Sequence, residues 1–323
     1  MEWLSLPNDN WQVAECGGRL FLPSGGVYPS VVALALIYQR GNLLSVPRPK
    51  PKSAWEVPDR VVLYSDEPAP ALDHMAIVTY LEESTGVVTL TRPGFFRANS
   101  PKDRKDFARE IAWTRVRNIS KPFQEIEPAY GEVQFELRAI EEPEKKVPGI
   151  LYDGLRLQRL LLSLLPPTER TLKVQHLVFT SRLIGTFGED GRYHAHVNLC
   201  GYPSIISTSG IVEAPAKPKE YYVLKRRFIE AGEAVPFELL KEQFAGQFID
   251  YDDPRLTEVL KGYALQCVVY AITKEPFCKS KECRLFDAHW QSEVMDAQLH
   301  GERFCKKHEQ TLKEIKQLVK RGR

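Results

Sequence analysis

The chain has 323 residues, 43% of them hydrophobic and 27% charged, so it can bury one large or two ordinary globular cores and is neither disordered nor fibrous. Its 44 Lys and Arg against 42 Asp and Glu leave a formal charge of +2, which excludes a global field that would draw the chain to nucleic acid or an anionic membrane. The longest uninterrupted apolar stretch, Val31 to Tyr38, is far shorter than the roughly 20 residues of a membrane-spanning helix. We therefore expect a soluble, cytoplasmic protein whose clustered cysteines are metal ligands or catalysts rather than disulfides.

Residues 1–58 are predicted to be an N-terminal extension that ends in a proline-rich linker. Residues 1–45 show no sustained apolar period, and residues 46–51 read VPRPKP, a basic run that favours extended backbone. We place an α/β subdomain at residues 59–170 and a second subdomain at residues 171–323.

From residue 60 onward, strand-like and helix-like segments alternate. The expected strands are 61–64, 87–90, 133–137, 172–179, 193–199 and 204–207, and the expected helices are 71–81, 102–116 and 150–165. Pro166 and Pro167 end the last of these helices because proline has no backbone N–H to donate. The alternation predicts an α/β (α+β) fold with a mixed sheet flanked by helices.

Residues 253–273 are predicted to form a helix that enters the core. Asp252, Asp253 and Pro254 provide its start signal. Its apolar side chains recur at helical spacing and form one stripe, made of Leu256, Val259, Leu260, Tyr263, Cys267, Tyr270 and Ala271.

Four residues near the C-terminus have the spacing of a zinc site. Four residues lie between Cys278 and Cys283, two lie between Cys305 and His308, and 21 lie between the pairs. Thiolate and imidazole ligands suit tetrahedral Zn²⁺, and four protein ligands leave no open position for water. We therefore predict one structural Zn²⁺ ion; the alternative is three unrelated buried thiols and a surface histidine.

This cysteine order resembles the second zinc site of archaemetzincins, metallopeptidases of the metzincin group, with the last cysteine replaced by His308. The resemblance covers about residues 170–310 and implies a metzincin-like C-terminal half. The chain more closely resembles an uncharacterised, mostly archaeal family that is named for metallopeptidases, from roughly residue 60 to the end. The matching strings are ISTSGIVEAPAKPKEYY (206–222), KGYALQ (261–266) and CRLFDAHWQ (283–291).

In archaemetzincins the first of these cysteines directly follows the catalytic motif HExxHxxxGxxH. Counting back from Cys278 therefore shows what stands at each motif position. The three His positions hold Gln266, Tyr270 and Phe277, the Glu position holds Cys267, the Gly position holds Lys274, and the expected methionine is Leu285. The resemblance thus implies that the usual catalytic zinc and its general base are absent.

Other histidines offer alternative sites. His194 and His196 point to one face of a predicted strand, where Glu213 or Asp190 could complete a relocated metal site. His289 and Glu293, like Asp296 and His300, are four apart on a predicted helix and could form a second metal or acid–base site. Hydrogen-bonded histidines and solvent-exposed ion pairs are the competing interpretations.

Two further segments could contact partners. Residues 207–222 are predicted to be a long shaped loop, which could contact a peptide or a phosphate or could be a solvated connector. The predicted helix after Cys305 carries seven Lys and Arg against two Glu, which fits either a solvated face or contact with nucleic acid. No GxxxxGK[ST], GxGxxG or GxSxG motif supports a nucleotide-binding or serine-hydrolase function.

The leading hypothesis is an archaemetzincin-like zinc protein that lacks the standard catalytic zinc and binds a peptide or protein partner. The first alternative is a metal-dependent hydrolase that uses His194 and His196 with Glu213 or His289. The second alternative is a nucleic-acid-associated zinc protein that acts through the basic C-terminal helix, although nucleic acid and membrane are not the partners that the composition favours.

Overall fold

The computed structural model describes residues 3–5, 12–16, 19–21, 55–65, 71–99, 103–142, 149–275, 277–300 and 304–322. Contacts divide the chain into two compact units, Met1–Val32 and Ala33–Arg323. The first unit contains an antiparallel sheet of β1 (Trp3–Ser5), β2 (Gln12–Cys16) and β3 (Arg19–Phe21). The proline-rich linker at residues 46–51 and the apolar stretch at residues 31–38 lie outside the described residues.

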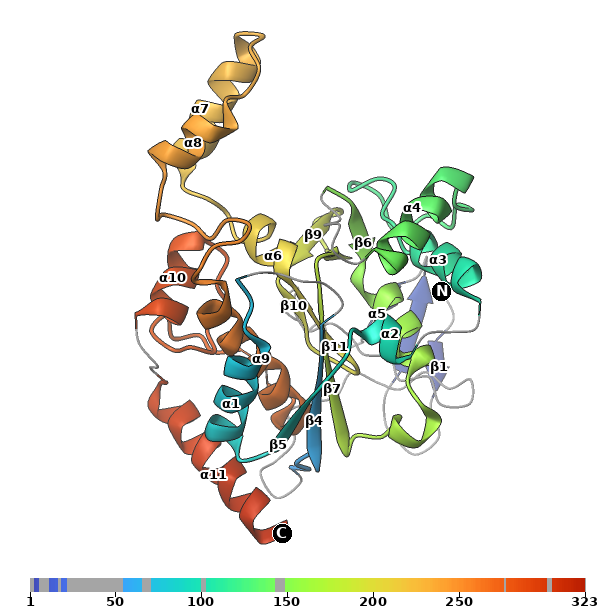
Figure 1. Cartoon of the computed structure of the whole chain (residues 1–323), viewed down its shortest axis with the longest axis vertical. Helices are drawn as coiled ribbons and strands as arrows, with labels where there is room; N and C mark the ends of the chain where they lie inside the picture. Colours follow the sequence, from blue (N-terminus) through green and yellow to red (C-terminus); the bar gives the residue numbers. More distant parts are fainter. Residues whose placement is uncertain are drawn as a thin grey trace. The chain divides into compact units, whose positions relative to one another are not determined.

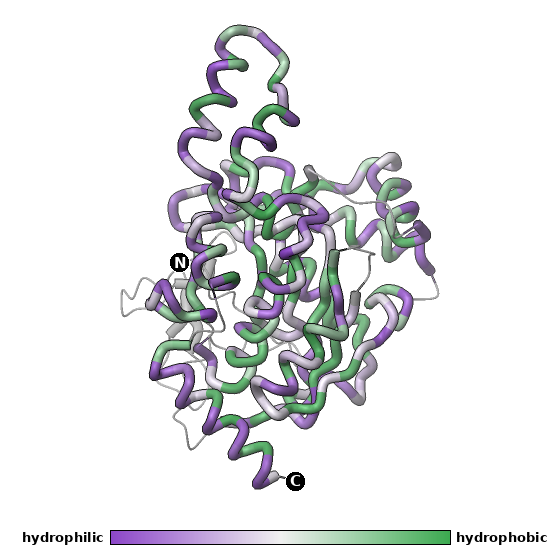
Figure 2. Tube along the Cα trace, turned by 60° about the vertical axis from the view of Figure 1, so that its left-hand side comes forward, coloured by the Kyte–Doolittle hydropathy of each residue, from purple (hydrophilic) through white to green (hydrophobic). Residues whose placement is uncertain are grey.

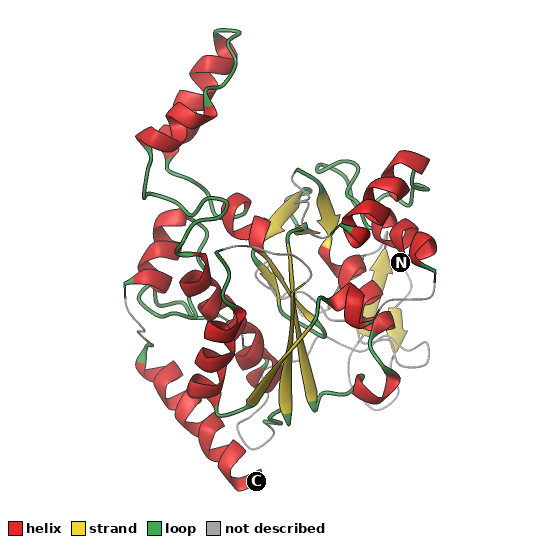
Figure 3. Ribbon diagram, in the orientation of Figure 1, coloured by secondary structure: helices red, strands yellow, loops and turns green. Residues whose placement is uncertain are grey.

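A five-stranded mixed sheet forms the centre of the second unit (Figures 1 and 3). Its order is β10 (Asn198–Leu199), β11 (Ser204–Ser207), β7 (Val174–Thr180), β4 (Arg60–Ser65) and β5 (Val88–Arg92). The last four strands are parallel to one another, and only β10 runs antiparallel. All seven residues of β7 are buried, as expected for a central strand that is covered on both faces.

Helices cover both faces of this sheet, as Figure 1 shows, so the predicted mixed sheet flanked by helices is confirmed. One side carries α1 (His74–Thr85), α9 (Leu256–Thr273), α10 (Gln291–Leu299) and α11 (Lys306–Gly322). The other carries α2 (Phe95–Ala98), α3 (Arg104–Trp113), α4 (Tyr130–Glu141) and α5 (Gly154–Leu164). Asp73, Asp103 and Asp153 cap α1, α3 and α5 by accepting hydrogen bonds from first-turn backbone N–H groups.

A smaller sheet and a helical hairpin complete the unit. The smaller sheet has the order β6 (Leu151–Asp153), β8 (Leu183–Phe187) and β9 (Tyr193–His196). A 3-10 turn (Pro167–Glu169) and α6 (Thr208–Glu213) connect the layers. Helices α7 (Lys219–Glu230) and α8 (Phe237–Gln243) form a hairpin that extends away from the sheet (Figure 2).

Several expected boundaries and one element type are wrong. Residues 133–137 alternate apolar and polar side chains like a strand, yet they lie inside α4. Two interactions stabilise the helix: Glu132 accepts a hydrogen bond from the N–H of Ala129 at its start, and Glu136 forms a buried ion pair with Arg115. Segment 150–165 begins as β6, segment 193–199 is divided between β9 and β10 in two different sheets, and segment 207–222 contains α6 and the start of α7.

The carboxylate of Glu136 joins α4 to the smaller sheet. It is fully buried and accepts hydrogen bonds from Arg115 at 2.5 Å, from Arg182 at 3.0 Å and from the Tyr152 hydroxyl at 2.7 Å. Removing one of the charged members would leave a buried charge with less compensation, which would destabilise the folded protein.

Helix α9 is buried on almost every side rather than along one stripe, because the sheet, α1 and α10 all pack against it. It begins at Leu256, after the expected start signal, since the Asp253 carboxylate accepts from the N–H of Arg255 in the preceding turn. No helix among the described residues is long and apolar enough to cross a membrane. The subdomain boundaries at 58/59 and 170/171 stay predictions, and β4 pairs with β7 across the second one.

A backbone contact at Gly210 gives a test of the packing between α6 and β9. A Cβ atom at Gly210 would collide with the backbone carbonyl oxygen of His196, whereas one at Gly131 in α4 would meet nothing within 4 Å. We expect Gly210→Ala to lower the free energy of unfolding by roughly 2 kcal/mol, and Gly131→Ala to raise it by up to about 1 kcal/mol. Urea denaturation measures both, and equal effects would contradict the close contact.

Buried His176 on β7 predicts acid sensitivity. Burial lowers its pKa to about 4, and the Tyr64 hydroxyl lies 3.1 Å from its Nδ1. The unfolded chain, with a histidine pKa of about 6.5, therefore binds more protons than the folded one between those two values, and stability falls as pH drops through that window by at most about 3 kcal/mol.

We expect His176→Gln to flatten the dependence of the unfolding free energy on pH between 6.5 and 4. Exposed His300→Gln is the matched control. Equal slopes in His176→Gln and in the unaltered chain would show that His176 is not the source of this sensitivity.

Candidate metal centre

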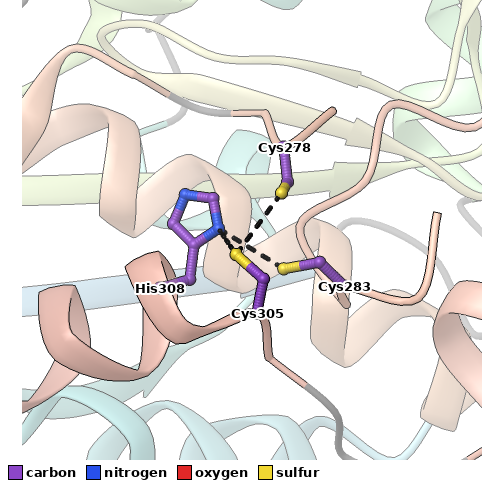
Figure 4. A group of neighbouring side chains, drawn as sticks. All are labelled: Cys278, Cys283, Cys305 and His308. Carbon is purple, nitrogen blue, oxygen red and sulfur yellow. Dashed lines mark hydrogen bonds between the residues drawn. The ribbon is translucent and has the colours of Figure 1, made fainter. Parts of the chain in front are cut away.

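The four predicted ligands come together at one point beside α9 and α11 (Figure 4). Cys278 and Cys283 lie in the loop after α9, Cys305 directly precedes α11, and His308 is in the first turn of that helix. Their ligand atoms all lie within 4.8 Å of one another, and His308 presents Nδ1 to the sulfur atoms. The group could therefore hold a metal ion.

The distances fit tetrahedral zinc. Zinc–sulfur and zinc–nitrogen bonds at tetrahedral angles place two sulfurs about 3.8 Å apart, and a sulfur and a nitrogen about 3.6 Å apart. Cys278 Sγ and Cys305 Sγ are 3.7 Å apart, and His308 Nδ1 lies 3.4 Å from Cys283 Sγ and 3.3 Å from Cys305 Sγ. The other pairs of ligand atoms lie within 4.8 Å, so movements of at most about 1 Å would bring all four to tetrahedral spacing.

Local backbone structure positions the ligands. The loop from Cys278 to Phe286 closes on itself because the N–H of Cys278 donates to Leu285 at 2.6 Å and the N–H of Phe286 donates to Cys283 at 2.8 Å. The N–H of Ser280 also points at Cys278 Sγ at 3.3 Å. On the other side, the first turn of α11 holds Cys305 and His308 together through a hydrogen bond from the N–H of His308 to the carbonyl of Cys305 at 2.8 Å.

The protonation states of the four side chains differ when no metal ion is bound. Burial raises the pKa of the Cys283 thiol to about 12 and also raises that of Cys278, so both thiols stay protonated without a nearby positive charge. Burial opposes ionisation of Cys305 as well, but backbone and thiol hydrogen bonds bring its pKa below the usual value. Burial lowers the pKa of His308, which keeps its imidazole neutral and able to coordinate.

Of the residues at the register of the archaemetzincin motif, three lie inside the core, whereas Lys274 and Phe277 are partly exposed. Gln266 is fully buried; its Oε1 accepts from Asn198 at 3.0 Å, and its Nε2 donates to the carbonyl of Phe286 at 3.1 Å. Cys267 is also fully buried, and Tyr270 is 3% exposed. Lys274 forms the left-handed C-cap of α9 with φ 65°, and Leu285 is buried.

The structure does not gather the other histidine candidates into a metal site. His194 Nε2 pairs with Asp190 at 2.7 Å, while His196 Nε2 is 2.7 Å from the Thr186 hydroxyl. Glu213 instead accepts from the hydroxyl of Tyr251. Across the part of the chain that the structure describes, the Cys3His cluster is the only group that brings three or more His, Cys, Asp or Glu ligand atoms this close.

The pairs on α10 have structural partners. Glu293 accepts from the backbone N–H groups of His289 and Trp290 and thereby caps the helix. His289 lies before α10 rather than within it, and His300 follows the helix and pairs with exposed Asp296 at 3.1 Å.

The partner-contact candidates are placed on helices. In the segment 207–222, the Lys217 ammonium donates to the carbonyl of Val212 at 2.9 Å and lies over the rings of Tyr221 and Phe248. Helix α11 buries Leu312 and Ile315 and leaves most of its lysines exposed. Neither arrangement identifies a ligand.

The side chains that contact Gln266 and Cys267 were not among the residues predicted from the sequence. Asn198 and Cys200 belong to a short edge strand and the loop after it, and they contact α9 from more than sixty positions away in the sequence. Cys200 has no second cysteine nearby in the sequence, and the histidine four positions before it, His196, hydrogen-bonds to Thr186, so no local pattern paired Cys200 with Cys267. The parallel pairing of β11 with β7, which brings this loop onto α9, was the missing information.

Comparisons with known proteins give a family for the chain. No curated protein matches it. The crystal structure of a zinc-dependent peptidase from Methanocorpusculum labreanum (strain Z) is similar, with 10% sequence identity and a TM-score of 0.36 over 78% of this chain and 98% of that one. The family model described as "Probable metallopeptidase family (DUF6775)" matches residues 57–315. Since that match spans well over half of the sequence, the chain belongs to this metallopeptidase-like family.

Proposed function

We propose that this protein is an archaemetzincin-like member of its family that holds one structural zinc ion, lacks the standard catalytic zinc, and binds a peptide or protein segment rather than cleaving it. The observation that carries the proposal is the state of Gln266, Cys267 and Tyr270. They stand where the catalytic motif is expected, and all three are buried in the core.

Cys278, Cys283, Cys305 and His308 would hold the zinc. With four protein ligands the ion has no position for water, so it would supply cross-linking rather than chemistry. It would join the loop after α9 to the start of α11, and α11 in turn packs against α1 through its buried face. The zinc would thus link α11 to the loop after α9 and stabilise the packing of α11 against α1.

Peptide hydrolysis by zinc needs a metal-bound water and a base that accepts its proton. The amide of Gln266 is committed to Asn198 and to the backbone of Phe286, and the thiol of Cys267 has no access to solvent. Tyr270 offers a phenol in place of an imidazole. These side chains provide neither a ligand set with an open position nor a solvent-facing base.

The α7–α8 hairpin supports the binding of a protein partner. Tyr221, Leu240, Phe244 and Phe248 already form a small core inside it. Further apolar side chains nevertheless face solvent, with Ile229 58% exposed, Phe237 52% and Val223 51%. Exposed apolar side chains gathered on one projecting element are typical of an interaction surface.

Zinc content tests the structural ion. We expect one zinc per chain in the purified protein. Cys283→Ser should lose the zinc and lower the free energy of unfolding by more than about 3 kcal/mol. The two remaining thiols and the imidazole would then lack the ion that joins them. Ser280→Ala, an exposed position in the same loop, is the control and should keep both zinc and stability. Full zinc content in Cys283→Ser would refute the ligand set.

Proteolysis assays test the absence of catalysis. The zinc-loaded protein is incubated with a mixed peptide library, and products are identified by mass spectrometry; we expect no cleavage. Cleavage that chelators abolish and that disappears in His194→Ala and His196→Ala would instead establish the hydrolase alternative.

Salt-sensitive binding of RNA or duplex DNA that is lost when residues after Glu309 are removed would establish the nucleic-acid alternative.

A further inference from the structure

A second pair of cysteines meets inside the core, away from the Cys3His cluster. Cys200 follows β10, Cys267 lies in the middle of α9, and their sulfur atoms are 3.8 Å apart. The side chains are 2% and 0% exposed. At this separation the Cys200 thiol donates a hydrogen bond to the sulfur of Cys267, so both thiols are protonated when no ion is bound. The proposed function uses neither thiol.

One amide group faces both sulfur atoms. Asn198 Nδ2 lies 3.8 Å from Cys200 Sγ and 3.7 Å from Cys267 Sγ, and its two hydrogens are shared with two oxygen acceptors, Gln266 Oε1 at 3.0 Å and the backbone carbonyl of Tyr263 at 3.3 Å. Asn198 is itself buried, with 4% of its surface exposed. An N–H donor stabilises a sulfur that carries negative charge, as in a thiolate or a metal thiolate.

Two tyrosine hydroxyls on the same helix lack partners. Tyr263 and Tyr270 stand four residues before and three residues after Cys267, so all three side chains share one face of α9. Both hydroxyl oxygens are buried and make no hydrogen bond. An unmet buried hydroxyl costs about 1–3 kcal/mol. Burial, and then the charge that Cys200 would carry, raise the pKa of Tyr270 to about 12, which is consistent with a hydroxyl near that sulfur.

The number of ligands limits which metal ion the two cysteines can bind. Among the described residues, no His, Cys, Asp or Glu joins Cys200 and Cys267 to make a group of three close ligand atoms. Zn²⁺ asks for four ligands, whereas soft thiolates select monovalent Cu(I), which two sulfurs can hold. A disulfide would require the sulfurs to approach to about 2.05 Å. It would also leave no charge on sulfur for Asn198 to stabilise.

We propose that Cys200 and Cys267 form a buried two-thiolate site for a thiophilic monovalent cation, with Cu(I) as its probe. Binding releases one proton from each thiol and leaves a single negative charge on the complex. Asn198 already lies beside that charge, and the hydroxyl of Tyr270, which the charge of Cys200 influences, is available to it. The site is separate from the Cys3His cluster and does not depend on the proposed structural zinc.

The test uses the full-length, zinc-loaded protein without oxygen. Cu(I) buffered by a competing chelator is added, and both metals are counted after desalting. We expect one Cu(I) per chain with the zinc retained, and thiolate-to-copper absorption from two sulfur ligands. Cys200→Ser and Cys267→Ser should abolish binding, and Asn198→Ala should weaken it roughly tenfold. Val268→Ala, a fully buried neighbour on α9, controls for lost packing and should still bind.

The proposal would be overturned if no copper bound, or if copper bound only as zinc leaves. Unchanged copper binding in the Cys200→Ser/Cys267→Ser double variant would also overturn it. So would a purified chain whose mass is lower by two hydrogen atoms, because these thiols would then already form a disulfide. Circular dichroism confirms that each variant is folded. If Cys267→Ser does not fold, Cys200→Ala at the loop position and Asn198→Ala decide the question.

Discussion

The burial of α9 is the constraint that separates the two groups of thiols, one inside the core and one beyond the end of the helix. Of its 18 residues, 14 are buried between the sheet, α1 and α10, so each polar side chain on it must find a partner inside the protein or go without. Gln266 finds one in Asn198 and another in the backbone of Phe286, whereas the hydroxyls of Tyr263 and Tyr270 find none. A hydrolytic metal on this helix would need a path to solvent, and the packing leaves none at Gln266 and Cys267. The Cys3His cluster avoids the same constraint because it lies beyond the end of the helix.

The two groups of thiols differ in what surrounds them. In the Cys3His cluster a tight loop and the first turn of α11 bring four possible ligand atoms together, and the neutral imidazole of His308 supplies the fourth of them. Within the described ranges no third ligand atom joins Cys200 and Cys267, but an amide group lies beside both sulfurs. The first arrangement suits a closed divalent site that holds two elements together, and the second suits a soft ion with two ligands. Membership of a metallopeptidase-like family therefore does not require that the metal chemistry of this chain be peptidase chemistry.

Local patterns predicted the parts of the structure that local interactions determine. The Cys3His cluster was predicted because paired spacing reflects one tight loop and one helical turn, and β4, β7 and α9 were predicted because long apolar runs have few alternatives. The strand expected at 133–137 was wrong because the buried pairing of Glu136 with Arg115 and Arg182 outweighs its alternating pattern. The contact of Cys200 with Cys267 could not be predicted, since it depends on which strands become neighbours in the sheet.

The most direct test of the account is a crystal structure of the purified protein with anomalous scattering measured at the zinc absorption edge. We predict one zinc peak, bound by Cys278, Cys283, Cys305 and His308 with no water ligand, and no zinc beside Gln266, Cys267 or Tyr270. A zinc ion bound elsewhere with a water molecule in its coordination shell, or a Cys3His cluster without metal in protein never exposed to chelators, would contradict the account.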